Sequence, residues 1–346
     1  MEARIPPVLL LPAPRTSTAE LLARAAAWRG YDVAERAAHA EGRQVHWYGG
    51  PRAAARVAGP LDLGLLEPAD DWLTRVPRPL LRRSVRLTTL AEARTLRERV
   101  FVKPPSAKLD LLPAAVHQDG TGLPGGLDGA TPVLVSGVVE FAAEYRLFVL
   151  DGEAVAGSRY AVHGRLDPAP LDAESRAFGR TVLEATAAGL PSAVCLDIGL
   201  LSDGGWAVVE ANMTWFAHCY AAEPDRVLDV VLRAAGPLAA VADRDRPHLR
   251  GSGAAPGPVW RLTAHRHRPI RRGLSAPAPR VCRQSPVVPG GRPRGVWCVL
   301  SVRRAQDLVL GVLGLAPGAA RVRAWGHLPA VAGGASRGRR DFDDRP

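Results

Sequence analysis

Two carboxylates and a carboxamide stand where a β-hairpin would bring them together. The stretch 195–215 has two apolar runs around a Ser-Asp-Gly-Gly turn sequence, which is typical of a hairpin. With Asp203-Gly204 as a two-residue loop, Asp197 lies directly opposite Glu210. Asn212 follows on the same face, because strand side chains alternate. Facing carboxylates repel unless they are protonated or bridged by a cation, so these three oxygen donors predict a hard metal ion.

The other face of this hairpin would pack into the core. It carries six apolar side chains, namely Leu196, Ile198, Leu200, Ala207, Val209 and Ala211. One face therefore packs, and the other gathers the polar groups. The alternative to a metal site is a solvated strand face, which acidic residues on strands commonly form.

Lysine is rare in this chain. Of 45 Lys and Arg residues, only Lys103 and Lys108 are lysine. Two lysines so close together suggest chemistry that needs a compact ammonium group rather than a planar guanidinium. Lys103 ends an apolar run, Phe-Val-Lys, before a loop, which is a good position from which to reach phosphate oxygens. The alternative, coincidental codon usage, remains open for Lys108.

A second hairpin is predicted over residues 145–160, with Asp151-Gly152 as its two-residue turn. In that register Glu144 faces Arg159, and Arg146 shares their face without an acid opposite it. Two arginines beside an acid can hold a phosphate or carboxylate group bidentately. For Arg159 the alternative is a plain cross-strand ion pair worth at most about 1 kcal/mol. Arg146 is therefore the better ligand candidate.

Alternating strands and helices surround these hairpins and predict a mixed α/β fold. Turn and cap signals separate the elements. Strands are expected at 7–11, 31–33, 45–48, 100–103 and 132–141, and helices at 19–29, 70–73, 87–97, 172–187 and 224–241. The Gly/Pro-rich stretch 117–132 is predicted to be a loop.

The net charge of +11 is unevenly placed. Residues 245–346 contain 19 Arg and 5 Asp, without Lys or Glu, whereas the first 244 residues carry 26 basic and 29 acidic side chains. Basicity alone therefore does not make the main body a nucleic-acid binder. The tail is predicted to be largely disordered, although 296–315 could form a local strand or helix. A basic arm for anionic partners and a shifted reading frame of GC-rich DNA are the other interpretations.

Cysteine use and hydropathy indicate the cellular setting. The four cysteines form no CxxC pair, and no apolar run has the length of a membrane span. The first 15 residues do not form a convincing signal peptide. We therefore expect a cytoplasmic protein without a membrane partner.

Taken in order, these pieces resemble the ATP-grasp superfamily of carboxylate–amine and carboxylate–thiol ligases. The matching segments are FVKP at 101–104, VVEF at 138–141, EYRLFVLDGEAVAGSRY at 144–160, and LDIG with VVEAN in the first hairpin. The resemblance implies an ATP-grasp domain at 85–243, preceded by a small α/β pre-ATP-grasp domain at 1–84. The basic tail at 244–346 follows.

The resemblance also implies roles for single residues. Lys103 would bind nucleotide phosphate, with Lys108 replacing part of the glycine-rich loop of other members. Glu140 would lie beside the adenine and ribose, and Glu144 is grouped with the nucleotide-binding residues. Arg146 and Arg159 would hold the γ-phosphate and an acyl phosphate. The metal ligands would be Asp197, Glu210 and Asn212, and the cofactors ATP and Mg²⁺.

The expected function is that of an ATP-dependent ligase. It would activate a carboxylate of a small molecule or peptide as an acyl phosphate, release ADP, and pass the acyl group to an amine or similar nucleophile. A non-catalytic relative that binds nucleotide or a partner is the first alternative. Nucleic-acid binding through the basic tail is the second, and it predicts affinity that falls steeply with salt. His218 borders the predicted site, but a lone histidine is more often structural, and it is left outside the catalytic set.

Overall fold

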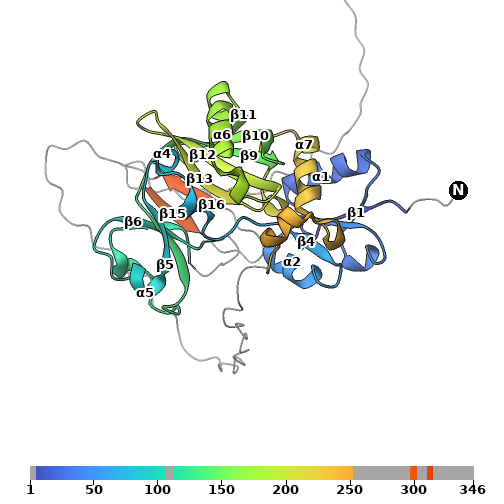
Figure 1. Ribbon diagram of the computed structural model, residues 1–346, viewed down its shortest axis with the longest axis horizontal. Helices are drawn as coiled ribbons and strands as arrows, with labels where there is room; N and C mark the ends of the chain where they lie inside the picture. The colour runs from blue at the N-terminus through green and yellow to red at the C-terminus, as the bar shows by residue number, and fades with distance from the viewer. Residues whose placement is uncertain (1–4, 106–111, 252–296, 302–309, 315–346) are drawn as a thin grey trace, which may run out of the picture. The chain divides into compact units, whose positions relative to one another are not determined.

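The computed structural model describes residues 5–105, 112–251, 297–301 and 310–314. The chain divides into two compact units, and the first contains nearly all described residues (Figure 1). Strands β15 (Trp297–Ser301) and β16 (Leu310–Gly314) pair in a two-stranded sheet that belongs mainly to the second unit. This confirms the expectation of local structure within 296–315. The remainder of the predicted tail beyond residue 251 lies outside the described residues.

The chain begins with the small α/β unit predicted for it. Three parallel strands form a sheet in the order β2-β1-β3. The helix α1 (Ser17–Trp28) follows β1, and its first turn is capped by Thr16, whose hydroxyl oxygen accepts a 3.2 Å hydrogen bond from the amide of Ala19. The strands are β1 (Val8–Leu10), β2 (Asp32–Ala34) and β3 (Val45–Trp47).

A four-stranded antiparallel sheet comes next, in the order β5-β8-β6-β7. Its strands are β5 (Val85–Thr89), β6 (Val100–Lys103), β7 (Ala115–His117) and β8 (Pro132–Ser136). The predicted helix over 87–97 is wrong, because residues 85–89 pair with β8 and leave only the four-residue α5 (Leu90–Ala93), capped by Thr89. The strand predicted over 132–141 stops at Ser136.

A five-stranded antiparallel sheet carries both predicted hairpins, in the order β11-β10-β9-β12-β13. Its strands are β9 (Phe141–Leu150), β10 (Glu153–Val162), β11 (Arg165–Pro170), β12 (Ala193–Leu201) and β13 (Trp206–Asn212). The turn at Asp151-Gly152 is confirmed, and both residues have positive φ, 53° and 85°. Strand β11 was not predicted, since its sequence contains two prolines and few apolar residues.

Two longer helices cover these sheets. Helix α6 (Ala173–Thr186) packs Val182 and Leu183 into the apolar core of the five-stranded sheet. Helix α7 (Pro224–Ala234) instead shares a core with α1 and the parallel sheet, and lies beside α1 in Figure 1. Arg29 joins these two helices through 2.6 and 2.5 Å contacts with Asp225 and Asp229.

Helix α7 ends at Ala234, seven residues before the predicted end at 241. Residues 235–237 form the short strand β14 (Ala235–Pro237), which pairs with β4 (Leu63–Leu65). The Gly236-Pro237 pair is the physical reason, because neither residue favours a helix interior. The remaining short helices are α2 (Pro51–Val57), α3 (Trp72–Arg75) and α4 (Arg78–Leu81).

The first residues of the predicted tail are ordered. A 3₁₀ segment spans Asp243–His248, and Asp245 within it is only 1 % exposed. Its carboxylate accepts hydrogen bonds from the amide and the hydroxyl of Ser192, at 2.7 and 2.6 Å. The structure therefore differs from a tail that is disordered from residue 244, because this acid closes a buried contact with the five-stranded sheet region.

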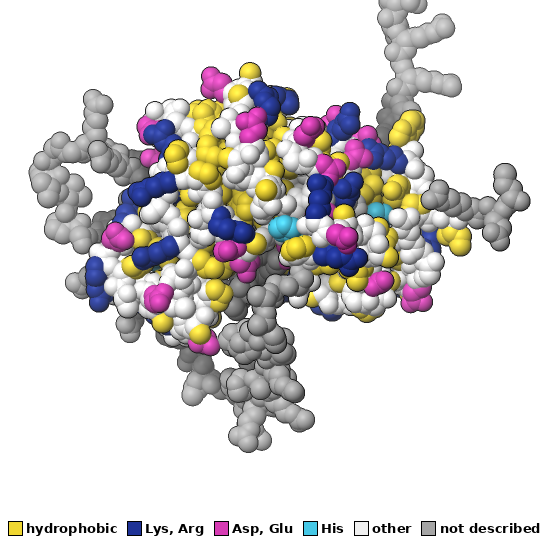
Figure 2. Space-filling view, viewed as in Figure 1, with side chains coloured by type: hydrophobic (Ala, Val, Ile, Leu, Met, Phe, Trp, Pro, Cys, Tyr) yellow, Lys and Arg dark blue, Asp and Glu magenta, His cyan; other side chains and the backbone are white. Residues whose placement is uncertain are grey.

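The surface and the helices bear on possible partners. Basic and acidic side chains are interspersed on the face shown in Figure 2. Among the described residues, no helix has the length and apolar character needed to cross a membrane. Cys195 and Cys219 are buried free thiols.

Candidate functional site

Strands β12 and β13 place the two predicted acids opposite each other. Asp197 pairs with Glu210 across the ladder, and Cys195 pairs with Asn212, as the sequence predicts. Asp197 is 1 % exposed, whereas Glu210 and Asn212 are half-buried. The three oxygen-bearing side chains therefore lie together at one end of this hairpin.

The route to this register differs from the prediction in two places. The amide of Leu201 donates to the carbonyl of Gly205 at 2.7 Å, so the loop has three residues rather than two. A β-bulge then leaves Val209 without a partner on β12, between the pairs Ile198–Val208 and Asp197–Glu210. The extra loop residue and the extra strand residue cancel. Consequently Val208, not Val209, is fully buried in the core.

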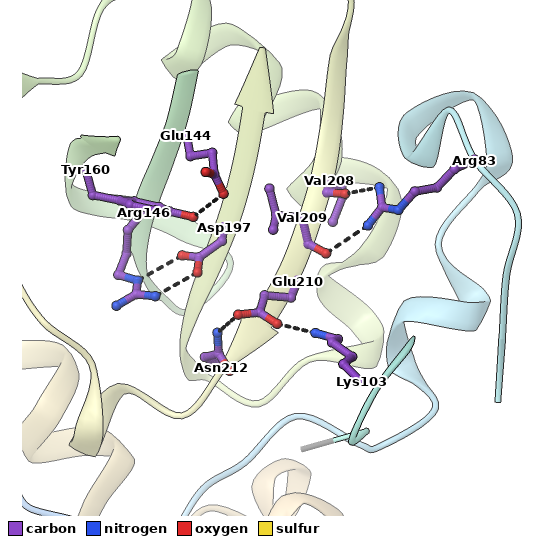
Figure 3. Close-up of polar contacts among 10 residues, drawn as sticks. All are labelled: Arg83, Lys103, Glu144, Arg146, Tyr160, Asp197, Val208, Val209, Glu210 and Asn212. Carbon is purple, nitrogen blue, oxygen red and sulfur yellow. Dashed lines mark hydrogen bonds and ion pairs between the residues drawn. The ribbon is translucent and has the colours of Figure 1, made fainter. Parts of the chain in front are cut away.

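Arg146 on β9 neutralises Asp197. The two residues are register partners, and the guanidinium donates from Nε and Nη2 to the two carboxylate oxygens at 2.9 and 2.7 Å (Figure 3). Their side chains are only 12 % and 2 % exposed. Burial opposes the charge on both groups and raises the pKa of Asp197, while the ion pair raises the pKa of Arg146 above its usual value. This is a buried, bidentate charge pair.

Lys103 makes the second charge pair. It ends β6 in the four-stranded sheet, and its ammonium group contacts Oε2 of Glu210. The side-chain amide of Asn212 donates to the other carboxylate oxygen of Glu210 at 2.6 Å. Burial opposes ionisation of Glu210, but Lys103 and Asn212 outweigh it and hold the pKa of this carboxyl below its usual value. The four charged groups thus form two adjacent ion pairs (Figure 3).

The donor set suits magnesium in its chemistry. Two carboxylates and one amide oxygen are hard donors, and Mg²⁺ in nucleotide sites takes few protein ligands beside water and phosphate. Among the described residues no group of three or more His, Cys, Asp or Glu side chains could hold a metal by itself. A metal here would therefore depend on Asn212 and on further oxygens that a phosphate chain could supply.

The pocket beside this cluster is narrow. It has a volume of about 20 Å³, close to that of a single water site. Its lining includes Lys103, Glu210 and Asn212 together with Asp70, Trp72 and Met213. The arrangement is closed, since the ion pair between Lys103 and Glu210 spans the two sheets.

The second hairpin brings a different residue to the site from the one predicted. Two bulges in β10 shift the register, so that Glu144 pairs with Ala161 and Arg146 with Ser158. Arg159 is displaced and forms a 3.1 Å ion pair with Asp167. The predicted cross-strand pairing of Glu144 with Arg159 is therefore wrong.

Tyr160 takes the place expected for Arg159. Its hydroxyl donates to Glu144 at 2.8 Å (Figure 3). Burial raises the pKa of Glu144, as do the charges of Asp197 and Glu210, against the effect of Tyr160. The ring of Tyr160 stacks on Tyr220 at 5.3 Å, and the Arg146 guanidinium lies 5.6 Å from both ring centres.

Sequence reasoning missed both tyrosines. Tyr160 stood at the end of the motif segment, but only the register shift reveals that it reaches Glu144. Tyr220 follows the hairpin by several residues and carried no spacing signal. Its backbone has a φ of 50°, which places it in a tight turn.

The remaining predicted residues lie elsewhere or outside the described chain. Glu140 is exposed in the link between β8 and β9, where its carbonyl accepts a 3.0 Å hydrogen bond from the amide of Ser202. Lys108 lies outside the described residues. His218 is exposed, and its Nδ1 is 3.4 Å from the hydroxyl of Thr18.

Comparison with known proteins gives one family match. Residues 80–230 match a family model described as an ATP-grasp domain, the second family of its clade. A comparison with curated proteins found no match.

Several solved structures resemble the chain at low identity. A RimK domain protein ATP-grasp from Sphaerobacter thermophilus is 16 % identical with a TM-score of 0.43, over 65 % of this chain and 99 % of that one. The D-cycloserine synthetase DcsG is also 16 % identical, with a TM-score of 0.41 over 65 % and 98 %. D-alanine–D-alanine ligase from Bacillus anthracis is 10 % identical, with a TM-score of 0.42 over 66 % and 97 %.

The family match contains the whole charge cluster. Both hairpins and Lys103 fall within residues 80–230, as do all strands of the four-stranded and five-stranded sheets. The chain therefore belongs to the ATP-grasp superfamily, through the domain at residues 80–230.

Proposed function

We propose that this protein is an ATP-dependent ligase that activates a carboxylate and transfers the acyl group to an amine or similar nucleophile. One observation carries the proposal. Two lysine- or arginine-bound carboxylates, Asp197 and Glu210, lie opposite each other inside an ATP-grasp domain. The substrate class is a small-molecule or peptide carboxylate.

In this proposal the cations bind phosphate. Lys103 leaves Glu210 for the phosphate chain of ATP, because phosphate offers it more negative charge than one carboxylate does. Arg146, oriented by Asp197 and the two tyrosine rings, holds the transferring phosphoryl group and then the acyl phosphate. The substrate carboxylate attacks the γ-phosphorus, ADP leaves, and the nucleophile displaces phosphate. Arg159 reaches the reaction only if the β10 register changes.

Asp197, Glu210 and Asn212 would hold magnesium. The ion would supply charge neutralisation for the phosphate oxygens. The protein's own contribution is to keep both carboxylates ionised at neutral pH, which Arg146 and Lys103 do. Release of Lys103 from Glu210 frees one of the two acids at the moment when phosphate arrives.

A nucleotide-binding protein without turnover is the second candidate. The small pocket and the two completed ion pairs favour it, since both acids already have partners. The two candidates differ in whether ADP is released.

The experiment is a screen for stimulated ADP release. The full-length protein, Mg²⁺-ATP and a panel of amino acids and dipeptides are incubated, and ADP and AMP are separated by chromatography. We expect ADP, not AMP, with at least one substrate pair, and no ADP from the variant Lys103→Met. ATP binding without ADP release for any pair would favour the non-catalytic candidate. AMP release would contradict the acyl-phosphate chemistry.

A further inference from the structure

The bulge in β13 is what allows Glu210 to face Asp197 in this sequence. With the three-residue loop, an unbulged ladder would pair Asp197 with Val209. Glu210 would then occupy the alternate face, because a one-residue slip exchanges the two faces of a strand. The site therefore depends on a local backbone feature next to one of its acids.

Arg83 holds this bulge. Its guanidinium donates from Nη1 to the carbonyl of Val208 at 2.7 Å and from Nη2 to that of Val209 at 3.0 Å (Figure 3). Successive carbonyls point to opposite sides of a regular strand. Only an irregular strand presents two consecutive carbonyls to one planar donor. The fork of Arg83 thus fits the bulged conformation and does not fit a regular one.

Two further observations separate Arg83 from an ordinary surface arginine. Nη1 also donates to the carbonyl of Leu81 at 3.0 Å, which ties the guanidinium to the end of α4. Burial lowers the pKa of Arg83 to about 10, against the nearby charge of Glu210. The residue remains charged at neutral pH, and these three acceptors are all backbone carbonyls. Strand β13 is an edge strand of its sheet, so its outer carbonyls face no neighbouring strand among the described residues.

We propose that Arg83 is a positioning residue that fixes the register of β13, and so places Glu210 and Asn212 opposite Asp197. Its effect on ligands rests on the proposed function, because the acids it positions are the proposed Mg²⁺-nucleotide ligands. Its effect on the ladder does not. A purely structural residue would change stability without changing which residues pair.

The test uses the full-length protein and the variants Arg83→Lys and Arg83→Met. Lysine keeps the charge and most of the stem but lacks the planar fork. Calorimetric titration with Mg²⁺-ADP, well below the unfolding temperature, should show at least tenfold weaker binding by both variants. NMR nuclear Overhauser contacts between β12 and β13 should lose the Asp197–Glu210 pair. If Arg83→Lys folds with the wild-type affinity and the wild-type contacts, the proposal is overturned. Should Arg83→Met not fold, Arg83→Lys decides alone.

The matched control is Arg82→Met. Arg82 is the adjacent residue and also reaches this hairpin, where it forms a 3.1 Å ion pair with Asp203 in the loop. Its side chain is 43 % exposed, and its partner lies in the loop rather than at the bulge. We expect affinity within about twofold of wild type and unchanged strand contacts. If wild-type protein binds no Mg²⁺-ADP, the proposed function fails, while the strand contacts of Arg83→Lys still decide the role of Arg83.

Discussion

At the scale of single residues, the site consists of two ion pairs that differ in exposure. Arg146 and Asp197 are nearly enclosed, whereas Lys103 and Glu210 remain 15 % and 30 % exposed. Breaking an enclosed pair leaves one charge without water or partner, which costs far more than breaking an exposed one. The first pair therefore carries structural as well as chemical weight.

We expect Asp197→Ala to lower the free energy of unfolding by about 3–5 kcal/mol, because Arg146 is left buried and unpaired. The measurement is urea unfolding followed by circular dichroism. Asp167→Ala is the matched control, since it breaks the more exposed Arg159–Asp167 pair. That control should cost at most about 1 kcal/mol. Equal losses in the two variants would show that Arg146 finds another partner or water.

Glu144 should make stability depend on pH. Its folded pKa lies above the ordinary value because of burial, so its ionised form destabilises the folded state. This penalty is present above the folded pKa and disappears as the pH falls through it towards the unfolded value. Glu144→Gln keeps an acceptor for Tyr160 and removes the charge. We expect this variant to be more stable than wild type at pH 8, with a smaller difference at pH 5.

Urea unfolding at both pH values checks this expectation. The control is Glu184→Gln, on the exposed face of α6. It should show no such convergence between pH 8 and pH 5. A constant difference for Glu144→Gln at the two pH values would mean that the carboxyl does not titrate between them.

At the scale of elements, sequence could predict the hairpins but not their irregularities. Turn residues and alternating apolar positions identified both turns, and the Asp197–Glu210 pair followed. The bulges in β10 and β13 leave no such signal, because they depend on how a strand fits its neighbours. For this reason Arg159 was expected where Tyr160 lies, and Val209 where Val208 lies. The pair at the centre of the site was predicted correctly because two register errors cancelled.

Gly157 illustrates how tightly the strands around Arg146 pack. A β-carbon added there would lie 2.7 Å from the carbonyl oxygen of Arg146 and 2.6 Å from Leu171. We expect Gly157→Ala to lower the free energy of unfolding by about 1–3 kcal/mol, as overpacking commonly does. Thermal and urea unfolding measure this.

Gly59→Ala is the control for that substitution. Its added β-carbon would meet no atom within 4 Å. We expect its stability to be unchanged or slightly higher, because alanine restricts the unfolded chain. A loss at Gly59 similar to that at Gly157 would attribute both effects to backbone conformation rather than to packing.

At the scale of the whole molecule, the ATP-grasp domain and the segments before and after it are interlocked. Helix α7 shares its core with the N-terminal sheet, and Asp245 is buried against Ser192. The boundaries drawn at 84/85 and 243/244 remain predictions. Composition placed the tail boundary near residue 244, but a composition change does not reveal that a single acid within it closes a buried hydrogen bond.

Two truncations test where the folded part ends. We expect residues 1–251 to keep the unfolding cooperativity and Mg²⁺-ADP affinity of the full chain. Residues 1–242 should be less stable by about 1–3 kcal/mol, because the amide of Ser192 loses its buried acceptor. Equal stability of the two truncations would contradict this. If nucleic-acid binding is found in the full chain, its loss in 1–251 would assign it to the basic tail.

The bulge at Val209 also says something about how this strand can change in length. Val209 behaves as a one-residue insertion, since its removal would leave Ile198–Val208 and Asp197–Glu210 as consecutive pairs of a regular ladder. Deletion of Val209 should then act as a suppressor of Arg83→Met, because the shortened strand has a single register and needs no clamp. In a lineage, loss of this residue would release position 83 from selection, and the two changes would be inherited together.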